Sequence, residues 1–165
     1  MTEIVTKIIA VANHKGGCGK TTTVVHLASE LAYLGHKVLV IDLDPQANAS
    51  LHIGRQHPSE VQTTSAELLT GDVQLLTDAL DEDTNFKNVS LIYGSLNLGK
   101  TEDQLKDDAP RPSEELATKL EYLKGLSDYI LIDCPPSLKL LTSNALAAAT
   151  HVIIPIESGS QYGLY

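Results

Sequence analysis

A glycine-rich segment near the amino terminus has the residue types of a phosphate-binding loop. Residues 13–22 read Asn-His-Lys-Gly-Gly-Cys-Gly-Lys-Thr-Thr. Glycines let several backbone N–H groups converge on one anion, and a terminal lysine and hydroxyl suit phosphate and Mg²⁺. The common pattern G-x-x-x-x-G-K-[ST] needs glycine at position 14, which here is His14. The chain instead reads K-G-G-x-G-K-[ST], because a second lysine, Lys15, lies five residues before Lys20.

The segments on either side predict a strand before this loop and a helix after it. Residues 8–12 form a short apolar run, as a buried parallel strand does. Apolar residues then recur at helical spacing from Val24 to Leu34, and Gly35 is placed to end the helix. The amino terminus of such a helix points at the bound anion. We therefore predict a deviant Walker A loop whose nucleotide contacts come from Lys15, Gly16, Gly17, Cys18, Gly19, Lys20, Thr21 and Thr22.

Two further apolar runs end in carboxylates. Residues 38–41 lead to Asp42 and Asp44, and the i, i+2 spacing of a strand places both on one face. Residues 129–132 lead to Asp133, in the form of a Walker B motif. The carboxyl ends of strands in an open α/β sheet meet beside the ligand crevice. We therefore predict that Thr21, Asp42 and Asp133 surround Mg²⁺, with Asp133 acting through water because this ion keeps much of its hydration shell.

These segments together resemble the ParA family of DNA-partitioning ATPases, within the wider ParA/MinD group. The resemblance rests on residues 15–22, 42–48 and 133–138, and it extends over residues 7–165. The patterns D-x-D-P-Q-x-N and D-C-P-P-S-L are more similar to ParA than to MinD. The resemblance implies ATP and ADP as ligands, Mg²⁺ as cofactor, and hydrolysis of ATP to ADP and phosphate.

The resemblance also implies roles for single residues. Lys15 corresponds to a signature lysine that reaches the partner's phosphates across a nucleotide-sandwich dimer, as an arginine finger does. Lys20 and Thr21 take the ordinary phosphate and Mg²⁺ roles, and Asp44 positions or activates the attacking water. Lys15, Asp44 and Lys20 are therefore the expected catalytic residues.

The implied function is segregation of a plasmid or chromosome. Mg-ATP drives a sandwich homodimer that binds nonspecific DNA, and a ParB-like centromere-binding protein stimulates hydrolysis. The expected location is cytoplasmic, with association to the nucleoid in the ATP state and none with a membrane. Three alternatives stay open: a ParA-like ATPase that positions protein cargo, a MinD-like membrane-cycling regulator, and a nucleotide-binding module with little turnover.

The length and net charge of the sequence limit which parts of this function we expect in residues 1–165. The sequence ends at Tyr165, where the family begins another helix, so we expect residues 1–165 to form a single nucleotide-binding domain without the carboxyl-terminal part of the family domain. That part usually contributes adenine contacts, dimer surface and basic residues. The chain has a net charge of -9 with 12 Lys and Arg residues, and DNA affinity depends mostly on contacts between cations and phosphates. We therefore expect the DNA surface to lie outside these residues.

Composition and element order predict the fold class. Hydrophobic residues make up 42% of the chain, which favours a folded domain, and no apolar stretch is long enough to span a bilayer. The amino terminus lacks the features of a secretory signal. Strands alternate with helices, so we predict a doubly wound α/β core of the P-loop NTPase type with a mostly parallel sheet.

Cys18 and Cys134 both fall in the nucleotide site. We expect both to serve as small packing residues and not to form a disulfide.

The middle of the chain predicts secondary structure and little chemistry. We expect short helices at residues 65–69 and 72–80, an acidic solvated turn at 81–83, and a strand at 89–95. Ser113 is placed to cap a helix that carries Leu116, Leu120 and Leu123 on one face, with Gly125 after it.

Overall fold

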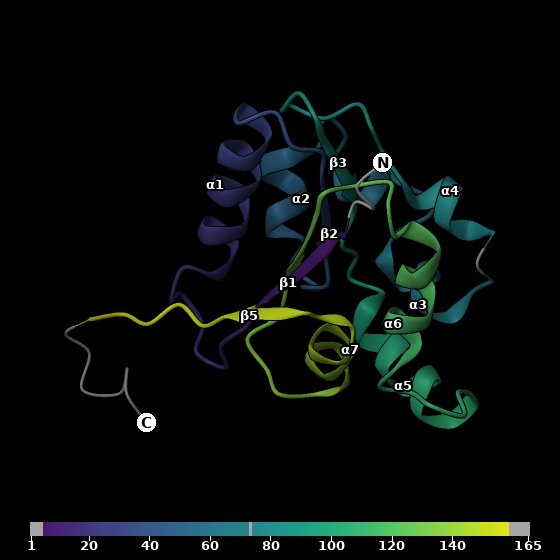
Figure 1. The fold of residues 1–165 in the computed structure, drawn as a ribbon. Coiled ribbons are helices and arrows are strands. Elements are labelled where there is room, and N and C mark those ends of the chain that lie inside the picture. Colours follow the sequence, from purple (N-terminus) through teal and green to yellow (C-terminus); the bar gives the residue numbers. More distant parts are fainter. Residues whose placement is uncertain (1–4, 73, 159–165) are drawn as a thin grey trace.

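Five parallel strands form one sheet in the computed structural model, which describes residues 5–72 and 74–158. The strands are β1 (Lys7–Val11), β2 (Val38–Asp42), β3 (Val89–Ile92), β4 (Tyr129–Asp133) and β5 (His151–Ile153). Their order in the sheet is β3-β2-β4-β1-β5, and every strand pairing is parallel (Figure 1). The predicted doubly wound α/β fold is therefore confirmed.

Helices cover the two faces of the sheet (Figure 1). One face carries α1 (Lys20–Tyr33) and α2 (Asn48–Ile53). The other carries α3 (Ser65–Thr70), α4 (Leu75–Ala79), α5 (Leu98–Asp108), α6 (Glu115–Leu120) and α7 (Leu140–Ala148). Two single 3₁₀ turns, η1 (Pro58–Glu60) and η2 (Glu121–Leu123), lie in the connections.

The strands alternate their side chains between two apolar cores. Leu39 and Ile41 of β2 pack into the core beneath α3 to α7, whereas Val38 and Val40 pack into the core beneath α1 and α2. All five residues of β2 are buried, as expected of a central strand in a parallel sheet covered on both faces.

Helix α1 begins directly after the glycine loop and ends near the predicted place. Val24, Ala28 and Ala32 are buried at a spacing of four residues, so one stripe of the helix faces the core. Gly35 follows the helix with φ +94, a left-handed conformation that glycine adopts without strain. Leu34, which the apolar spacing included in the helix, is instead the cap residue and is 71% exposed.

Several predicted boundaries in the middle of the chain differ from the structure. The strand expected at 89–95 ends at Ile92, and the helix expected at 72–80 is limited to Leu75–Ala79, with residue 73 outside the described residues. Ser113 does not cap α6, because the cap position is Glu114 and its side chain makes no capping bond. The helix at 65–69 is present, and a capping box between Thr64 and Glu67 begins it.

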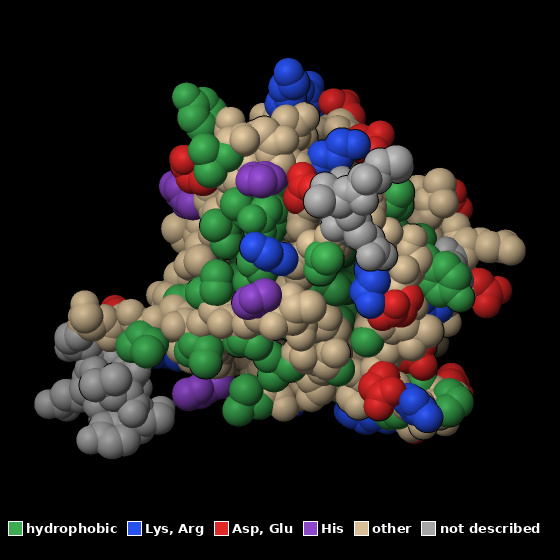
Figure 2. Space-filling view, viewed as in Figure 1, with side chains coloured by type: hydrophobic (Ala, Val, Ile, Leu, Met, Phe, Trp, Pro, Cys, Tyr) green, Lys and Arg blue, Asp and Glu red, His purple; other side chains and the backbone are tan. Residues whose placement is uncertain are grey.

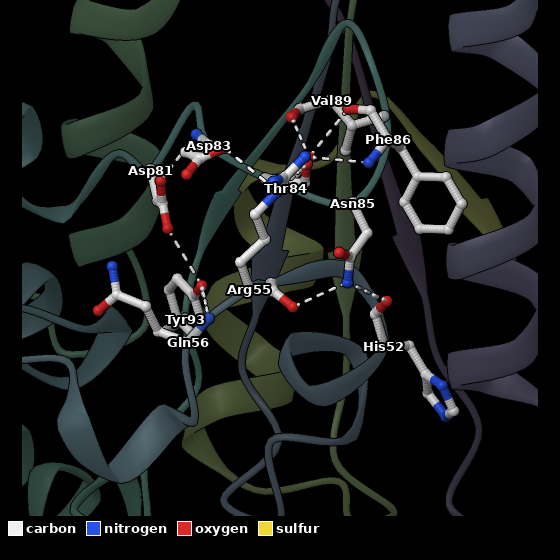
Figure 3. Close-up of polar contacts among 11 residues, drawn as sticks. His52, Arg55, Gln56, Asp81, Asp83, Thr84, Asn85, Phe86, Val89 and Tyr93 are labelled. Atoms are coloured by element: carbon white, nitrogen blue, oxygen red, sulfur yellow. Dashed lines mark hydrogen bonds and ion pairs between the residues drawn. The ribbon is translucent and has the colours of Figure 1, made fainter.

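The acidic turn at residues 81–83 is not merely solvated (Figure 3). Asp81 is half-buried and accepts a hydrogen bond of 3.1 Å from the Tyr93 hydroxyl, and Asp83 forms an ion pair of 3.2 Å with Arg55. The Arg55 Nε also donates to the main-chain oxygen of Thr84. This turn therefore anchors the chain that follows α2 to the region around β3.

Among the described residues, no helix combines the length and apolar character needed to cross a membrane.

Candidate functional site

Three loops converge where β1, β2 and β4 end. Val11 and Asp42 are both register partners of Asp133, so the phosphate loop after β1 and the acidic segment after β2 flank the end of β4. This is the convergence expected of the carboxyl edge of a parallel sheet. One detail of the sequence prediction is wrong, because β2 ends at Asp42 and Asp44 therefore lies in the following turn, not on the strand.

The glycine loop curls around the carbonyl group of Lys15. The Lys20 ammonium donates a hydrogen bond of 2.9 Å to that oxygen, and the Cys18 thiol donates to the same oxygen at 3.2 Å. Gly17 and Gly19 have φ values of +74 and +89, which explains why glycine occupies these positions. The buried Lys20 therefore already lies on the inner side of the loop, where a phosphate would be held.

Thr21 and Asp133 form a polar pair at the start of α1. The Thr21 hydroxyl donates a hydrogen bond of 2.7 Å to Asp133 Oδ2. The other oxygen, Oδ1, is buried and accepts no hydrogen bond from any described residue. Burial, and then the charge of Asp42, raise the pKa of Asp133 to about 7, against the lowering effect of the Thr21 bond. A buried carboxylate oxygen without a partner, beside a hydroxyl, is a donor set that fits Mg²⁺.

Asp42 is fully buried, and both of its carboxylate oxygens accept hydrogen bonds. Oδ2 accepts from the Ser50 backbone N–H at 2.8 Å and from the Ser50 hydroxyl at 2.7 Å, while Oδ1 accepts from the Asp44 N–H at 3.0 Å. Burial raises the pKa of Asp42 to about 6 even though these three bonds lower it. All three hydrogen-bond donors to this carboxylate are groups of the protein. The role of Asp42 as a Mg²⁺ ligand stays a prediction.

Asp44 lies in a tight turn between β2 and α2. Its Oδ1 accepts a hydrogen bond of 2.9 Å from the Gln46 N–H, and its main-chain oxygen accepts one of 2.8 Å from the Ala47 N–H. Ala47 has φ 52, which is left-handed and unusual for a residue with a Cβ. The Asp44 residue is 7% exposed, so one edge of it reaches the surface of the site.

Lys15 is held by its own chain in this structure. Its ammonium forms an ion pair of 2.7 Å with Glu157, and the lysine lowers the pKa of that carboxyl. Its backbone N–H donates to Asn13 Oδ1 at 2.9 Å, and Asn13 Nδ2 donates to the Pro155 carbonyl at 2.8 Å. The sequence prediction omitted Asn13 and Glu157. The preference of asparagine for bonding the backbone two residues ahead is a signal for Asn13, whereas no local pattern connects Glu157 with a loop at the other end of the chain.

The two cysteines are free and differ in their surroundings. Cys18 is half-buried in the glycine loop, and Cys134, which follows Asp133, is fully buried. Burial, with the charge of Asp133, raises the pKa of the Cys134 thiol to about 12.

Comparison with known proteins places the chain among nucleotide-binding ATPases. A family model described as an AAA domain (AAA_31) matches residues 6–165. The sporulation initiation inhibitor protein Soj of Bacillus subtilis is 42% identical over 153 residues, which are 92% of this chain and 58% of that protein. The chromosome partitioning protein ParA of Caulobacter vibrioides is 40% identical over 155 residues, which are 92% of this chain and 56% of that protein. The chain thus spans a little over half the length of the curated relatives it matches.

A solved structure agrees with the sequence relatives. Cobyrinic acid a,c-diamide synthase from Mycobacterium smegmatis, solved with a bound ATP analog and magnesium, superposes with a TM-score of 0.88 at 38% identity. The match covers 94% of this chain and 62% of that chain. The parallel sheet, the glycine loop with its two lysines and these similarities agree: the chain belongs to the family described by this AAA domain model, among its ParA/MinD-like P-loop ATPases.

Proposed function

We propose that the chain is the nucleotide-binding part of an ATPase for DNA segregation, acting in plasmid or chromosome partition. The nucleotide-binding part of this proposal is carried by the Thr21–Asp133 pair at the start of α1, in which one buried Asp133 oxygen has no partner among the described residues. The name of the Caulobacter relative, a chromosome partitioning protein, supports partition as the process.

ATP is the proposed substrate, with ADP and phosphate as products. The backbone N–H groups of residues 16–22 hold its phosphates, together with the Lys20 ammonium. Thr21 and Asp133 would hold Mg²⁺, which neutralises charge on the phosphate oxygens when it is bound. The synthase that was solved with an ATP analog and magnesium supports this ligand pair.

Lys15 is proposed to act on a second copy of the chain. Its position at the mouth of the glycine loop, paired with an exposed carboxylate, allows it to exchange Glu157 for a phosphate. An exposed ion pair of this kind contributes little free energy because water screens both charges, so the exchange costs little. In the sandwich homodimer each Lys15 completes the other chain's site and neutralises charge that develops during hydrolysis.

Asp44 is proposed to orient the attacking water, and a ParB-like centromere-binding protein to stimulate the reaction. The ATP-bound dimer would bind nonspecific DNA and so associate with the nucleoid. Residues 1–165 are proposed to act as one nucleotide-binding domain whose DNA-binding surface lies elsewhere in the protein. On the face viewed in Figure 2, the described Lys and Arg side chains are scattered and form no continuous basic patch.

Co-sedimentation of the Asp44→Ala variant tests the proposal, because slow hydrolysis holds the protein in its ATP state. The variant is made in a protein of the relatives' length that contains residues 1–165, and it is incubated with Mg-ATP and either duplex DNA of unrelated sequence or anionic liposomes, with ADP as the matched control. ATP-dependent and salt-sensitive binding to DNA is the expected result.

The other outcomes identify the alternatives. Binding to liposomes without binding to DNA would indicate a MinD-like membrane-cycling regulator. Binding to neither would favour a ParA-like ATPase that positions protein cargo, or a nucleotide-binding module with little turnover.

A further inference from the structure

Ser50 lies at the centre of a buried hydrogen-bond group that joins three segments of the chain. The residue is fully buried on α2. Its hydroxyl donates to Asp42 Oδ2 at 2.7 Å and accepts a hydrogen bond of 2.9 Å from the Gly94 N–H. Its backbone N–H donates to the same Asp42 oxygen at 2.8 Å. One hydroxyl therefore connects the end of β2, helix α2 and the chain that follows β3.

Gly94 fits this group because it has no side chain. A Cβ on residue 94 would lie 2.9 Å from Asp42 Cγ and 2.9 Å from the main-chain oxygen of Asp44. The second of these contacts is with backbone, which cannot rotate away as the end of a side chain can. The close approach of Gly94 therefore limits the space in which the Asp42 carboxylate and the Asp44 peptide can move.

The position of Asp44 depends on this group. The Asp44 N–H donates to Asp42 Oδ1, so the two oxygens of Asp42 connect Ser50 on one side with the turn at 44–47 on the other. A carboxylate that accepts three hydrogen bonds in a site closed to water has a fixed orientation. Rotating it would leave a buried N–H group without an acceptor, which costs about 1–3 kcal/mol.

We propose that Asp42 and Ser50 are positioning residues that hold Asp44 in its place beside the nucleotide, and that Asp42 is not a Mg²⁺ ligand. This inference rests on the proposed function for the role of Asp44. It replaces the sequence prediction that grouped Asp42 with Thr21 and Asp133 around the metal. Of the two fully buried carboxylates at this edge, Asp42 and Asp133, only Asp133 keeps an oxygen without a protein donor among the described residues.

The experiment compares Ser50→Ala and Asp42→Asn with Ser65→Ala in the full chain. Ser65 is the matched control because it is equally buried, and its hydroxyl also bonds to Asp42, at 2.6 Å to the main-chain oxygen. Removal of the Ser65 hydroxyl therefore costs stability without releasing the carboxylate. Urea unfolding of each variant measures that cost.

The steady-state ATPase reaction gives the first comparison. Ser50→Ala and Asp42→Asn are expected to lower kcat about tenfold or more, because a small displacement of a reacting group costs rate. The KM for ATP and the Mg²⁺ concentration at half saturation should stay within about twofold, since nucleotide and metal binding do not use the displaced group. Ser65→Ala should retain the wild-type kcat. A kcat for Ser50→Ala equal to that of Ser65→Ala overturns the inference, as does an increased Mg²⁺ requirement in Asp42→Asn.

Amide hydrogen exchange tests whether Ser50 holds the turn at Asp44 in place, and it needs no ATP hydrolysis. In wild type and in Ser65→Ala the Asp44 and Gly94 amides should be protected, and in Ser50→Ala both should exchange faster. Unchanged protection in Ser50→Ala overturns the inference. If the wild-type chain binds no nucleotide and hydrolyses no ATP, the proposed function fails, and the exchange result still shows whether Ser50 holds the turn.

Discussion

Asp133 and Asp42 lie opposite each other on neighbouring strands, and burial disfavours the charged form of both. The pKa rises from 3.8 to about 7 in Asp133 and from 3.8 to about 6 in Asp42. A folded-state pKa above the unfolded value means that the folded state binds protons more tightly. The stabilisation from each group is therefore complete below pH 3.8 and is lost as the pH rises through about 6 to 7.

The first prediction concerns this pH dependence. Without Mg²⁺ and nucleotide, the free energy of unfolding should increase when the pH is lowered from about 8 to about 5.5, because both carboxyls take up protons only in the folded state. Urea unfolding at a series of pH values measures the effect. Asp133→Asn should flatten the dependence and should be more stable than wild type at the upper end, by about 1–3 kcal/mol. A wild-type chain that loses stability steadily over this fall in pH would contradict the prediction.

The second prediction separates the two lysines of the glycine loop. Lys20→Ala should weaken ATP binding itself, because the buried ammonium lies inside the loop at the Lys15 carbonyl. Lys15→Ala should bind ATP normally and lose stimulated turnover, since its proposed target is the partner's nucleotide. Equilibrium titration with a fluorescent ATP analog and a turnover assay measure the two effects, and Lys100→Ala on the exposed face of α5 is the control. Unchanged turnover in Lys15→Ala would rule out the role across the dimer.

At the scale of elements, the sequence predicts the segments around the nucleotide well. Residues 7–11, 20–33, 38–42 and 129–133 form the expected strand, helix, strand and strand, because long apolar patterns and a glycine loop define them locally. The prediction is weaker where tertiary contacts determine the outcome. The predicted strand included residues 93–95, yet β3 ends at Ile92, because Gly94 donates its backbone N–H to Ser50 and not to a neighbouring strand.

The residues of the site also divide into those that a local sequence pattern identifies and those that only tertiary contacts identify. The glycines, Lys20, Thr21 and Asp133 were predicted because spacing within one segment identifies them. Ser50 and Glu157 were not, because each acquires its role from a contact with another segment, such as the Lys15–Glu157 pair across 142 positions of sequence. Such pairs have no local pattern that would identify them. Asn13 was also missed, although its bond to the Lys15 N–H two residues ahead follows a local preference of asparagine.

The third prediction compares two glycines. Gly94→Ala should destabilise the chain by about 1–3 kcal/mol, because the new Cβ would meet Asp42 and the Asp44 backbone at 2.9 Å. Gly99→Ala is the matched control, since nothing lies within 4 Å of its Cβ position and it belongs to α5. It should stabilise the chain by about 0.5–1 kcal/mol through helix propensity. Thermal unfolding measures both, and equal effects would contradict the close approach of Gly94.

At the scale of the whole molecule, charge determines which partners residues 1–165 can attract. The net charge is -9, with 21 acidic residues against 12 basic ones. A DNA duplex repels such a chain unless basic residues gather on one surface.

The fourth prediction follows from this balance. Residues 1–165 with Mg-ATP should not co-sediment with DNA at low salt, whereas a protein of the relatives' length that contains these residues should do so and release the DNA as salt increases. Sedimentation over a series of salt concentrations measures both. Strong, salt-sensitive binding by residues 1–165 alone would show that dimerisation assembles a basic surface from the residues present here.

The unequal burial of the two cysteines gives the protein an internal reporter of its nucleotide state. Cys134 is fully buried and its thiol resists ionisation, so an alkylating reagent should modify only Cys18 while the chain is folded. Cys18 belongs to the loop that would surround the phosphates, so Mg-ATP should slow its alkylation. Mass spectrometry should find one modified thiol in the native chain and two after unfolding. The rate of labelling would then report occupancy of the site without a mutation, a fluorophore or any hydrolysis.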